Sequence, residues 1–255
     1  MKNLLALVPL FIALGARAQT PAPVTPFGNV VQNYTLSWSD EFDGPTLDMT
    51  KWQYREDSKM WSTQLAANDS VADGKFIIAL KKEAAGKKNY TGGGIISRQT
   101  FQYGYYEARF KVPPGSGWHT SFWMALYDPS KKTSARTQEI DVCEQDSDKT
   151  TKYSAGVIAW GNKAKGIGRK WVPTPDLAAD FHVWGCEYTP TTVSFFFDGK
   201  LTHQADVSKI KQGPQNIWLT CIASYLGSTY YVDGKKLPAT AEFDYVRYFQ
   251  SPANP

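Results

Sequence analysis

Short runs in which apolar and polar residues alternate, separated by Gly- and Pro-rich turns, recur along most of the chain. A period of two residues is typical of β-strands that bury one face, and Asp198-Gly199 between two such runs is typical of a tight hairpin turn. No stretch shows a convincing amphipathic helix pattern. The predicted strands cover residues 34–38, 76–80, 95–97, 103–112, 118–126, 139–144, 153–160, 181–188, 192–197, 200–205, 217–223 and 241–249. The sequence therefore predicts an all-β fold, an antiparallel sandwich or jelly roll.

Residues 161–180 form a long stretch with little periodicity. The stretch contains several Gly, Lys and Pro residues, so we expect a loop. Loops of this length are often functional and can border a cleft.

The N-terminus has the features of a processing signal. Lys2 provides the positive start, residues 4–14 form a short apolar run, and Ala16-Arg17-Ala18 is a small-x-small cleavage site. The run is too short to span a membrane, and no later segment resembles a transmembrane helix. We therefore expect a signal peptide at residues 1–18, a flexible lead-in at 19–32, and a single domain at 33–255 that is secreted or periplasmic.

The charge balance limits the partners that we expect. Loss of Lys2 and Arg17 with the signal peptide lowers the basic count from 28 to 26, against 24 acidic residues, so the net charge falls from +4 to +2. The remaining lysine pairs suit solvated loops better than a nucleic-acid-binding stripe. We expect no nucleic-acid partner, no membrane partner, and a monomer.

The three cysteines, Cys143, Cys186 and Cys221, do not have the spacing of a zinc site. An exported chain could join Cys186 to Cys221 in a disulfide. Because all three lie in strand-like segments, three small buried hydrophobic residues are an equally good interpretation.

Glu139-Ile140-Asp141-Val142-Cys143-Glu144 carries three carboxylates in six residues. In an extended strand Glu139 and Asp141 share one face, and Glu144 is out of step by one residue. A β-bulge at Val142-Cys143 would return Glu144 to that face, and bulges are common beside active sites. Like charges at this spacing oppose one another, so one acid should keep its proton to a raised pH. A protonated acid beside an ionised one is what retaining glycoside hydrolysis needs. The alternative interpretation of this stretch is an ordinary strand with a solvated acidic face.

These residues resemble the motif of glycoside hydrolase family 16, the laminarinase, lichenase, agarase and carrageenase group. Glu139, Asp141 and Glu144 match the family's Glu-x-Asp-x-x-Glu pattern in its longer form, which contains the bulge residue. Other segments match family strands in the same order along the chain: residues 37–44, 103–109, 117–124, 181–184, 187–190, 197–199 and 243–248. The resemblance covers nearly all of the expected mature chain.

The resemblance implies a β-jelly roll of two antiparallel sheets, with an open concave cleft for a polysaccharide. It also implies an endo-acting enzyme that retains the anomeric configuration and requires no cofactor for catalysis. Glu139 would be the nucleophile and Glu144 the acid/base. Asp141 would hydrogen-bond Glu139 and tune its charge. The spacing alone does not decide which glutamate has which role.

Several substrate-binding residues are also implied. Trp123 matches a family tryptophan near the negative subsites, and Trp118 lies one residue before the other such position. Core packing is the alternative for both. Asn68 matches a family asparagine that can reach the sugar, with a turn residue as the alternative. His119 is a further expected polar contact with the substrate, with a loop residue as the alternative, and Trp160 is another expected contact.

Asp244 matches a carboxylate that binds a structural calcium ion in many members of the family. Calcium takes six to eight oxygen ligands, so one aspartate does not make a site. The resemblance thus adds a structural calcium only as an expectation.

Three departures from the family pattern lie beside the acids and concern the substrate. His119-Thr120 stands where glucanases usually have Trp-Pro, Ala159 replaces the histidine of His-Trp-Gly, and Gln145-Asp146-Ser147 follows the last glutamate. We narrowly favour β-1,3- or mixed-linked glucan as the substrate. The alternative is a β-galactan such as agar, porphyran, carrageenan or neutral galactan. Arg and Lys side chains clustered in the cleft would favour a sulfated substrate.

A non-catalytic carbohydrate-binding sandwich is the competing class of protein. Such a module would keep the aromatic residues but has no use for both Glu139 and Glu144. The three acids therefore favour the enzyme.

Overall fold

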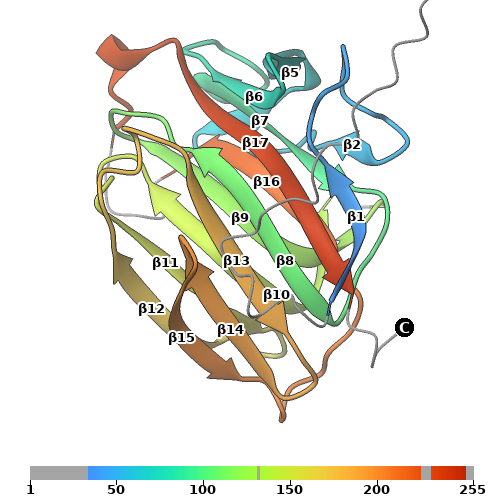
Figure 1. Ribbon diagram of the computed structural model, residues 1–255. Coiled ribbons are helices and arrows are strands. Elements are labelled where there is room, and N and C mark those ends of the chain that lie inside the picture. The colour runs from blue at the N-terminus through green and yellow to red at the C-terminus, as the bar shows by residue number, and fades with distance from the viewer. Residues whose placement is uncertain (1–33, 131–132, 225–230, 251–255) are drawn as a thin grey trace, which may run out of the picture.

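The computed structural model describes residues 34–130, 133–224 and 231–250, and these form two stacked β-sheets (Figure 1). The predicted signal peptide and lead-in lie outside these residues. The first sheet has the order β15-β14-β13-β8-β17-β6-β5, with β1 paired to β17. Its strands are β1 (Thr35–Asp40), β5 (Asp69–Ala72), β6 (Lys75–Leu80), β8 (Gly104–Lys111), β13 (His182–Tyr188), β14 (Thr192–Phe197), β15 (Lys200–Asp206) and β17 (Ala239–Gln250).

The second sheet has the order β12-β11-β10-β9-β16-β7-β4-β3, with β2 paired to β7. Its strands are β2 (Trp52–Tyr54), β3 (Ser58–Lys59), β4 (Ser62–Gln64), β7 (Tyr90–Ser97), β9 (Trp118–Asp128), β10 (Thr133–Asp146), β11 (Lys152–Ala159), β12 (Lys165–Pro173) and β16 (Asn216–Ala223). Two 3₁₀ turns, η2 (Ala66–Asn68) and η3 (Gly234–Lys236), are the helical elements of the described residues. Within those residues no helix is long and apolar enough to cross a membrane. The predicted all-β sandwich is confirmed, except that β4 pairs with β7 in parallel.

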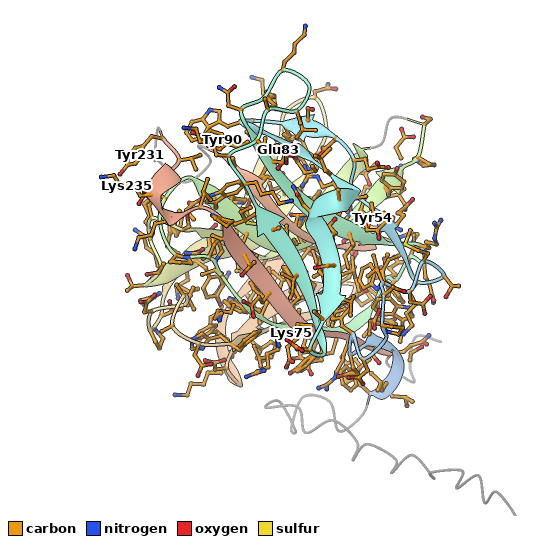
Figure 2. All side chains as sticks on the ribbon, turned by 90° about the horizontal axis from the view of Figure 1, so that it is seen from above. Tyr54, Lys75, Glu83, Tyr90, Tyr231 and Lys235 are labelled. Atoms are coloured by element: carbon orange, nitrogen blue, oxygen red, sulfur yellow. The ribbon has the colours of Figure 1, made fainter. Side chains whose placement is uncertain are left out.

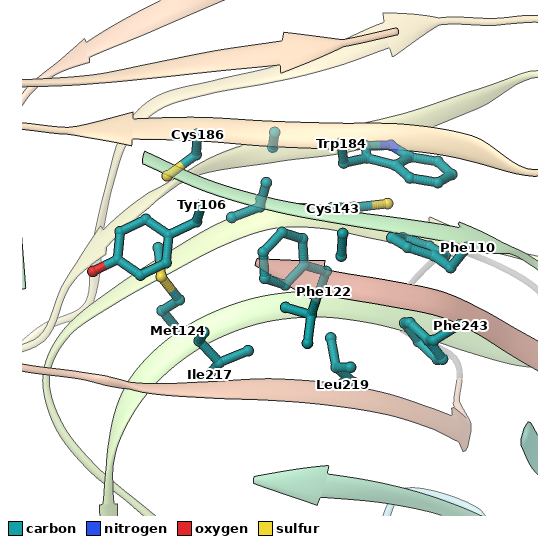
Figure 3. Packing of buried hydrophobic residues seen from close by; sticks show 14 of the residues in the cluster. Tyr106, Phe110, Phe122, Met124, Cys143, Trp184, Cys186, Ile217, Leu219 and Phe243 are labelled. Carbon is teal, nitrogen blue, oxygen red and sulfur yellow. The ribbon is translucent and has the colours of Figure 1, made fainter. Parts of the chain in front are cut away.

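The core lies between the two sheets, as Figure 3 shows. Alternation creates it: along β6, for example, every second side chain is buried. Phe122 of β9 is completely buried and points into this layer, where Phe110 and Trp184 of the other sheet stack with ring centroids 3.9 Å apart. One face of the second sheet packs in the core. A site on these strands can therefore lie only on their opposite face.

The cysteines belong to this core. Cys143, Cys186 and Cys221 are free and buried. The prediction of a disulfide between Cys186 and Cys221 is therefore wrong, and the interpretation of the three cysteines as small buried hydrophobic residues is confirmed.

The loop predicted at residues 161–180 is also partly wrong, because β12 occupies Lys165–Pro173. This strand lies at the edge of its sheet, and of its nine residues only Val172 is fully buried. An edge strand that buries so little gives no apolar alternation for a sequence pattern to detect.

Replacement of Phe122 by Ala tests the core. We expect Phe122→Ala to lower the free energy of unfolding by about 3–5 kcal/mol, because it removes a large buried side chain and leaves a cavity. Urea denaturation followed by tryptophan fluorescence measures the change. Leu201→Ala is the control, since Leu201 is 55% exposed and surface substitutions usually change stability by less than about 0.5 kcal/mol. Equal effects of the two variants would contradict this description of the core.

Candidate active site

The β-bulge predicted in the acidic stretch is present in β10. Opposite β9, Asp141 pairs with Trp123 and Cys143 pairs with Phe122, so Val142 is an extra residue. Opposite β11, the register shifts between Asp141 and Glu144. Val142 and Cys143 both enter the core as a result, although they are adjacent in sequence.

The bulge brings Glu139, Asp141 and Glu144 to one pocket on the outer face of the second sheet. This central pocket has a volume of about 310 Å³ and combines carboxylates, aromatic rings and cationic side chains. It is lined by Arg55, Lys59, Met60, His119, Ser121, Trp123, Glu139, Asp141, Glu144, Ile158, Trp160, Arg169, Thr220 and Ile222. Five neighbouring strands, β9 to β12 and β16, supply ten of these fourteen residues.

Glu144 is held between two cationic groups. His119 Nε2 lies 3.3 Å from Glu144 Oε1, and Arg169 Nη2 forms an ion pair with Glu144 Oε2. Burial alone would raise the pKa of Glu144, but the hydrogen bond and charge of His119, followed by those of Arg169, lower it to about 2. Glu144 is therefore ionised at neutral pH in this arrangement.

Asp141 is the carboxyl group that keeps its proton. It is fully buried, and burial, followed by the negative charges of Glu144 and Glu139, raises its pKa well above the usual value. A side-chain hydrogen bond to Glu139 also raises it, as the resemblance implied for this residue. One acid of the three thus has a raised pKa, as predicted, but it is Asp141, whereas the pKa of Glu144, the acid/base that the resemblance implies, is lowered.

The ring nitrogens of His119 both face carboxylates. Nδ1 lies 2.8 Å from Asp146 Oδ1, and Nε2 faces Glu144. Burial would lower the pKa of His119, but the hydrogen bonds to Asp146 and Glu144 and their charges raise it to about 9. His119 is thus an imidazolium held between two carboxylates at the wall of the central pocket, and its direct contact with a substrate stays a prediction.

Trp123 and Trp160 both line the central pocket, as a substrate contact requires. Trp123 stacks on Trp218, with centroids 4.4 Å apart and an interplanar angle of 27°. Its Nε1 donates to Thr220 Oγ1 at 3.2 Å. Trp160 Nε1 donates to Glu139 Oε2 at 3.2 Å, so this tryptophan also orients a carboxylate.

Trp118 and Asn68 are not in the central pocket. Trp118 is 2% exposed, belongs to the core and packs edge-on against Tyr90. It lies five positions before Trp123 on the same strand, and this odd offset turns it to the opposite face. Asn68 is buried, and its Nδ2 donates to the Gly92 carbonyl oxygen at 3.0 Å. The prediction that these two residues bind sugar is corrected by their positions, and both have structural partners.

Asp244, the expected calcium ligand, lies on β17 of the other sheet. Its Oδ2 accepts a bond from Arg109 Nη1 at 2.6 Å, so a guanidinium occupies the position beside the carboxylate. Among the described residues no group of three or more His, Cys, Asp or Glu side chains could hold a metal ion. Asp244 is thus paired with an arginine, and the structural calcium ion stays a prediction.

The sequence interpretation missed the cations of the central pocket. Arg169 lies on β12, where a loop was expected, and reaches Asp141 Oδ2 at 3.3 Å as well as Glu144. Arg55 is buried beside the pocket and is paired with Asp57 at 2.9 Å. Alternation could not have found Arg169: the register shifts at Gly168, where φ is 60°, so Ile167 packs against the core and Arg169 lines the pocket although they are two residues apart.

Comparison with known proteins adds four matches of different kinds. A family model described as "Beta-porphyranase A-D, GH16 domain" matches residues 34–249. "Beta-porphyranase E" from Zobellia galactanivorans is 32% identical over 188 residues, which cover 64% of this chain and 66% of the relative. "Glucan endo-1,3-beta-glucosidase A1" from Niallia circulans is 25% identical over 268 residues, covering 89% of this chain and 39% of the relative. The crystal structure of LamAcat from Zobellia galactanivorans has a TM-score of 0.77 and 22% identity, covering 87% of this chain and all of that one.

A jelly roll with three carboxylates beside a pocket defines a glycoside hydrolase as the class of protein. The family model covers most of the chain, so the chain belongs to glycoside hydrolase family 16, in the group of the β-porphyranase A–D domain. The resemblance noted in the sequence is confirmed, and the likeness to LamAcat confirms the jelly-roll fold. The chain spans less than two thirds of the length of these two curated relatives.

Removal of the Arg169 charge tests the electrostatics of the pocket. We expect Arg169→Gln to raise the pKa of Glu144 from about 2, because the variant loses one of the two cations that favour the carboxylate. Titration of ¹³C-labelled glutamate carboxyl groups by NMR measures this pKa. Lys170→Gln is the matched control, since Lys170 is the next residue of β12 and is directed to Thr202. An unchanged Glu144 titration in Arg169→Gln would contradict the ion pair.

Proposed function

We propose that this protein is an endo-acting glycoside hydrolase that cleaves a β-linked polysaccharide by a retaining double displacement. The observation that carries the proposal is the bulged strand β10, which turns Glu139, Asp141 and Glu144 to one pocket. A pair of carboxyl groups on one side of a bound sugar is the machinery of this reaction. A non-catalytic sugar-binding sandwich has no need for this buried and electrostatically costly arrangement.

In the first half-reaction, Glu139 attacks the anomeric carbon, and Glu144 donates a proton to the departing oxygen. In the second, Glu144 accepts a proton from water, which releases the sugar from Glu139. Asp141 keeps its proton directed to Glu139, and Trp160 donates a second hydrogen bond to the same carboxylate. These donors limit the negative charge on Glu139 as the covalent intermediate breaks down. The chemistry uses carboxyl groups and water alone, so we propose that catalysis requires no cofactor.

For the substrate, we propose a sulfated β-galactan of the porphyran type in place of the narrowly favoured glucan. Arg55, Lys59 and Arg169 line the central pocket, which is the clustering of cationic side chains that a sulfated sugar favours. The family model and the relative with 32% identity both carry porphyranase descriptions, which supports the same choice. Glucan is the second candidate, because the relative with the greater coverage of this chain is described as a glucan endo-1,3-β-glucosidase.

A second hollow next to the central pocket suits a polymeric, anionic substrate. This lateral pocket, of about 410 Å³, shares Met60 with the central one. Tyr90 and Tyr231 lie on the same side of the molecule in Figure 2 and both line it. The other lining residues in the described part of the chain are Trp61, Lys87, Lys88, Asn89 and Val232, which include two lysines and no acid. The aromatic rings and lysine ammonium groups of this lateral pocket would contact sugar units of the polysaccharide next to those bound in the central pocket.

We also propose that the signal sequence expected at residues 1–18 exports the enzyme, because a polysaccharide substrate lies outside the cell. Polysaccharide is then the partner, and the monomer expected from the sequence remains a proposal.

The roles of the two glutamates are tested by substitution. Glu139→Gln should lower kcat by about 10⁴-fold or more, because the variant lacks the nucleophile, while the polysaccharide still binds. Glu144→Ala should be partly rescued by azide, giving a glycosyl azide of retained configuration, because azide needs no base. Reducing-end release and NMR of the azide product are the measurements. Normal turnover of Glu139→Gln would refute the mechanism.

The substrate is tested with a panel of laminarin, mixed-linkage glucan, agarose, carrageenan, neutral galactan, porphyran and desulfated porphyran. We expect porphyran to release reducing ends fastest. Desulfation should lower kcat/KM by about 10- to 100-fold, the equivalent of one charge-assisted hydrogen bond of about 1.5–3 kcal/mol. Faster cleavage of laminarin than of porphyran would favour the glucan candidate, and no cleavage of any polymer would favour the binding module.

A further inference from the structure

His119 is a buried imidazole that the reaction described above does not use. It is 5% exposed and lies at the edge of the central pocket, on β9. The register of β9 and β10 places it opposite Asp146, and Ser121 opposite Glu144. Because Glu144 and Asp146 are two residues apart on one strand, their side chains point to the same face as His119.

The three side chains form a line of hydrogen bonds. Asp146 Oδ1 lies 2.8 Å from His119 Nδ1, and a carboxylate at Nδ1 requires a proton on that nitrogen. In the imidazolium form Nε2 also carries a proton, and it faces Glu144 Oε1 at 3.3 Å. Gln145, between the two acids, is buried, and its Nε2 donates to the Asp146 carbonyl oxygen at 2.6 Å, which fixes the end of β10.

The resting pocket poses a difficulty for the first half-reaction. Glu144 must provide a proton to the departing oxygen, yet His119 and Arg169 hold it as a carboxylate. A guanidinium does not give up a proton in a protein. The third partner, Ser154 Oγ, lies 3.5 Å from Glu144 Oε2 and is a neutral hydroxyl that stays protonated. Among the groups that bind Glu144 in the described structure, His119 is therefore the one that can supply the proton.

We propose that His119 is the proton store of Glu144, passing a proton to it when the glycosidic bond breaks and taking one back when water attacks. The inference rests on the proposed function and names a positioning residue of the same site. In this role His119 acts through Glu144 and not on the sugar itself.

Atoms and charges balance over the two half-reactions. In the first, the anomeric carbon bonds to Glu139 and the glycosidic bond breaks. The departing oxygen takes a proton from Glu144, and His119 Nε2 gives Glu144 that proton. The products are a neutral imidazole, an ionised Glu144, the glycosyl ester and the free alcohol. In the second, water attacks the anomeric carbon, the ester bond to Glu139 breaks, and the proton of water passes through Glu144 to His119.

The charged groups around His119 favour this role. Asp146 and Glu144 on β10 both stabilise the imidazolium, and they raise the pKa of His119 to about 9 against the effect of burial. Arg169 on β12 acts on the far oxygen of Glu144. On β16 the residue opposite His119 is Ile222, which does not titrate. Because the pKa is raised, His119 is charged below about pH 9 and loses its proton as the pH rises through that value.

His119→Gln tests the proposal, because the amide can donate a hydrogen bond to Glu144 but cannot transfer a proton. We expect the alkaline limb of the pH–kcat profile, near pH 9 in the natural enzyme, to move towards acid by about two units or more. At pH 8 kcat on polysaccharide should fall by about 10²-fold, the lower end of the range for general acid–base catalysis. At pH 5 the loss should be small, because Glu144 of the variant binds its own proton more readily.

The leaving group separates proton transfer from a structural effect. An aryl glycoside with a nitrophenolate leaving group needs no acid to depart, so formation of the glycosyl-enzyme should change less than about threefold in His119→Gln. An equal loss on the polysaccharide and on the aryl glycoside, or an unmoved alkaline limb, would overturn the proposal. His182→Gln is the control, since His182 is bound to Asp198, away from the central pocket.

A measurement that needs no turnover completes the test. The chain has three histidines, so NMR of ¹⁵N-labelled imidazoles can follow His119 in the protein. We expect its midpoint near pH 9 and a lower midpoint in Asp146→Asn. A midpoint near the ordinary value of about 6.5 would overturn the inference even in an active enzyme. If no polysaccharide is cleaved but the midpoint is near 9, the proposed function fails while the pairing stands.

Discussion

Three carboxyl groups share one wall of a largely buried strand because each has a different means of limiting its charge. Asp141 keeps its proton, Glu144 lies between Arg169 and His119, and Glu139 accepts a bond from Trp160. An unpaired buried carboxylate would cost several kcal/mol or more. The neighbouring strands provide these groups: His119 is on β9, Arg169 is on β12, and Trp160 directly follows β11.

The parts of the site that follow local periodicity could be predicted from the sequence. Alternation placed Glu139 and Asp141 on one face, and the odd spacing of Glu144 required the bulge found at Val142. Periodicity does not reveal partners from distant segments. Arg169 is on an edge strand with almost no buried side chain, so its sequence lacks the apolar alternation of a core strand. Pairing of charges in space, such as Arg169 with Glu144, has no signature along the chain.

The two tryptophans of β9 show that the face of a strand decides whether a residue belongs to the core or to the site. Trp118 and Trp123 lie on the same strand, but they are five positions apart, an odd offset, so one packs in the sandwich and the other borders the pocket. The family pattern alone assigned both to the substrate. His119 has the same parity as Trp123 and lies on the pocket face, yet its two nitrogens are already bound to carboxylates. Facing a pocket is therefore necessary for contact with a substrate but does not establish it.

The position of β12 has a consequence for which residues of such a chain can change. Gly156 of β11 lets this strand approach closely, since a β-carbon there would lie 2.7 Å from Arg169 Cα. Gly168 lies equally close to Ala205 of β15, so β12 also borders the edge of the other sheet. Apart from Val172, its side chains contribute little to the core. Mutations at the exposed positions of β12 can thus vary this edge of the molecule while leaving the packing around Glu139 intact. Arg169 is the exception, because it also compensates the charge of Glu144.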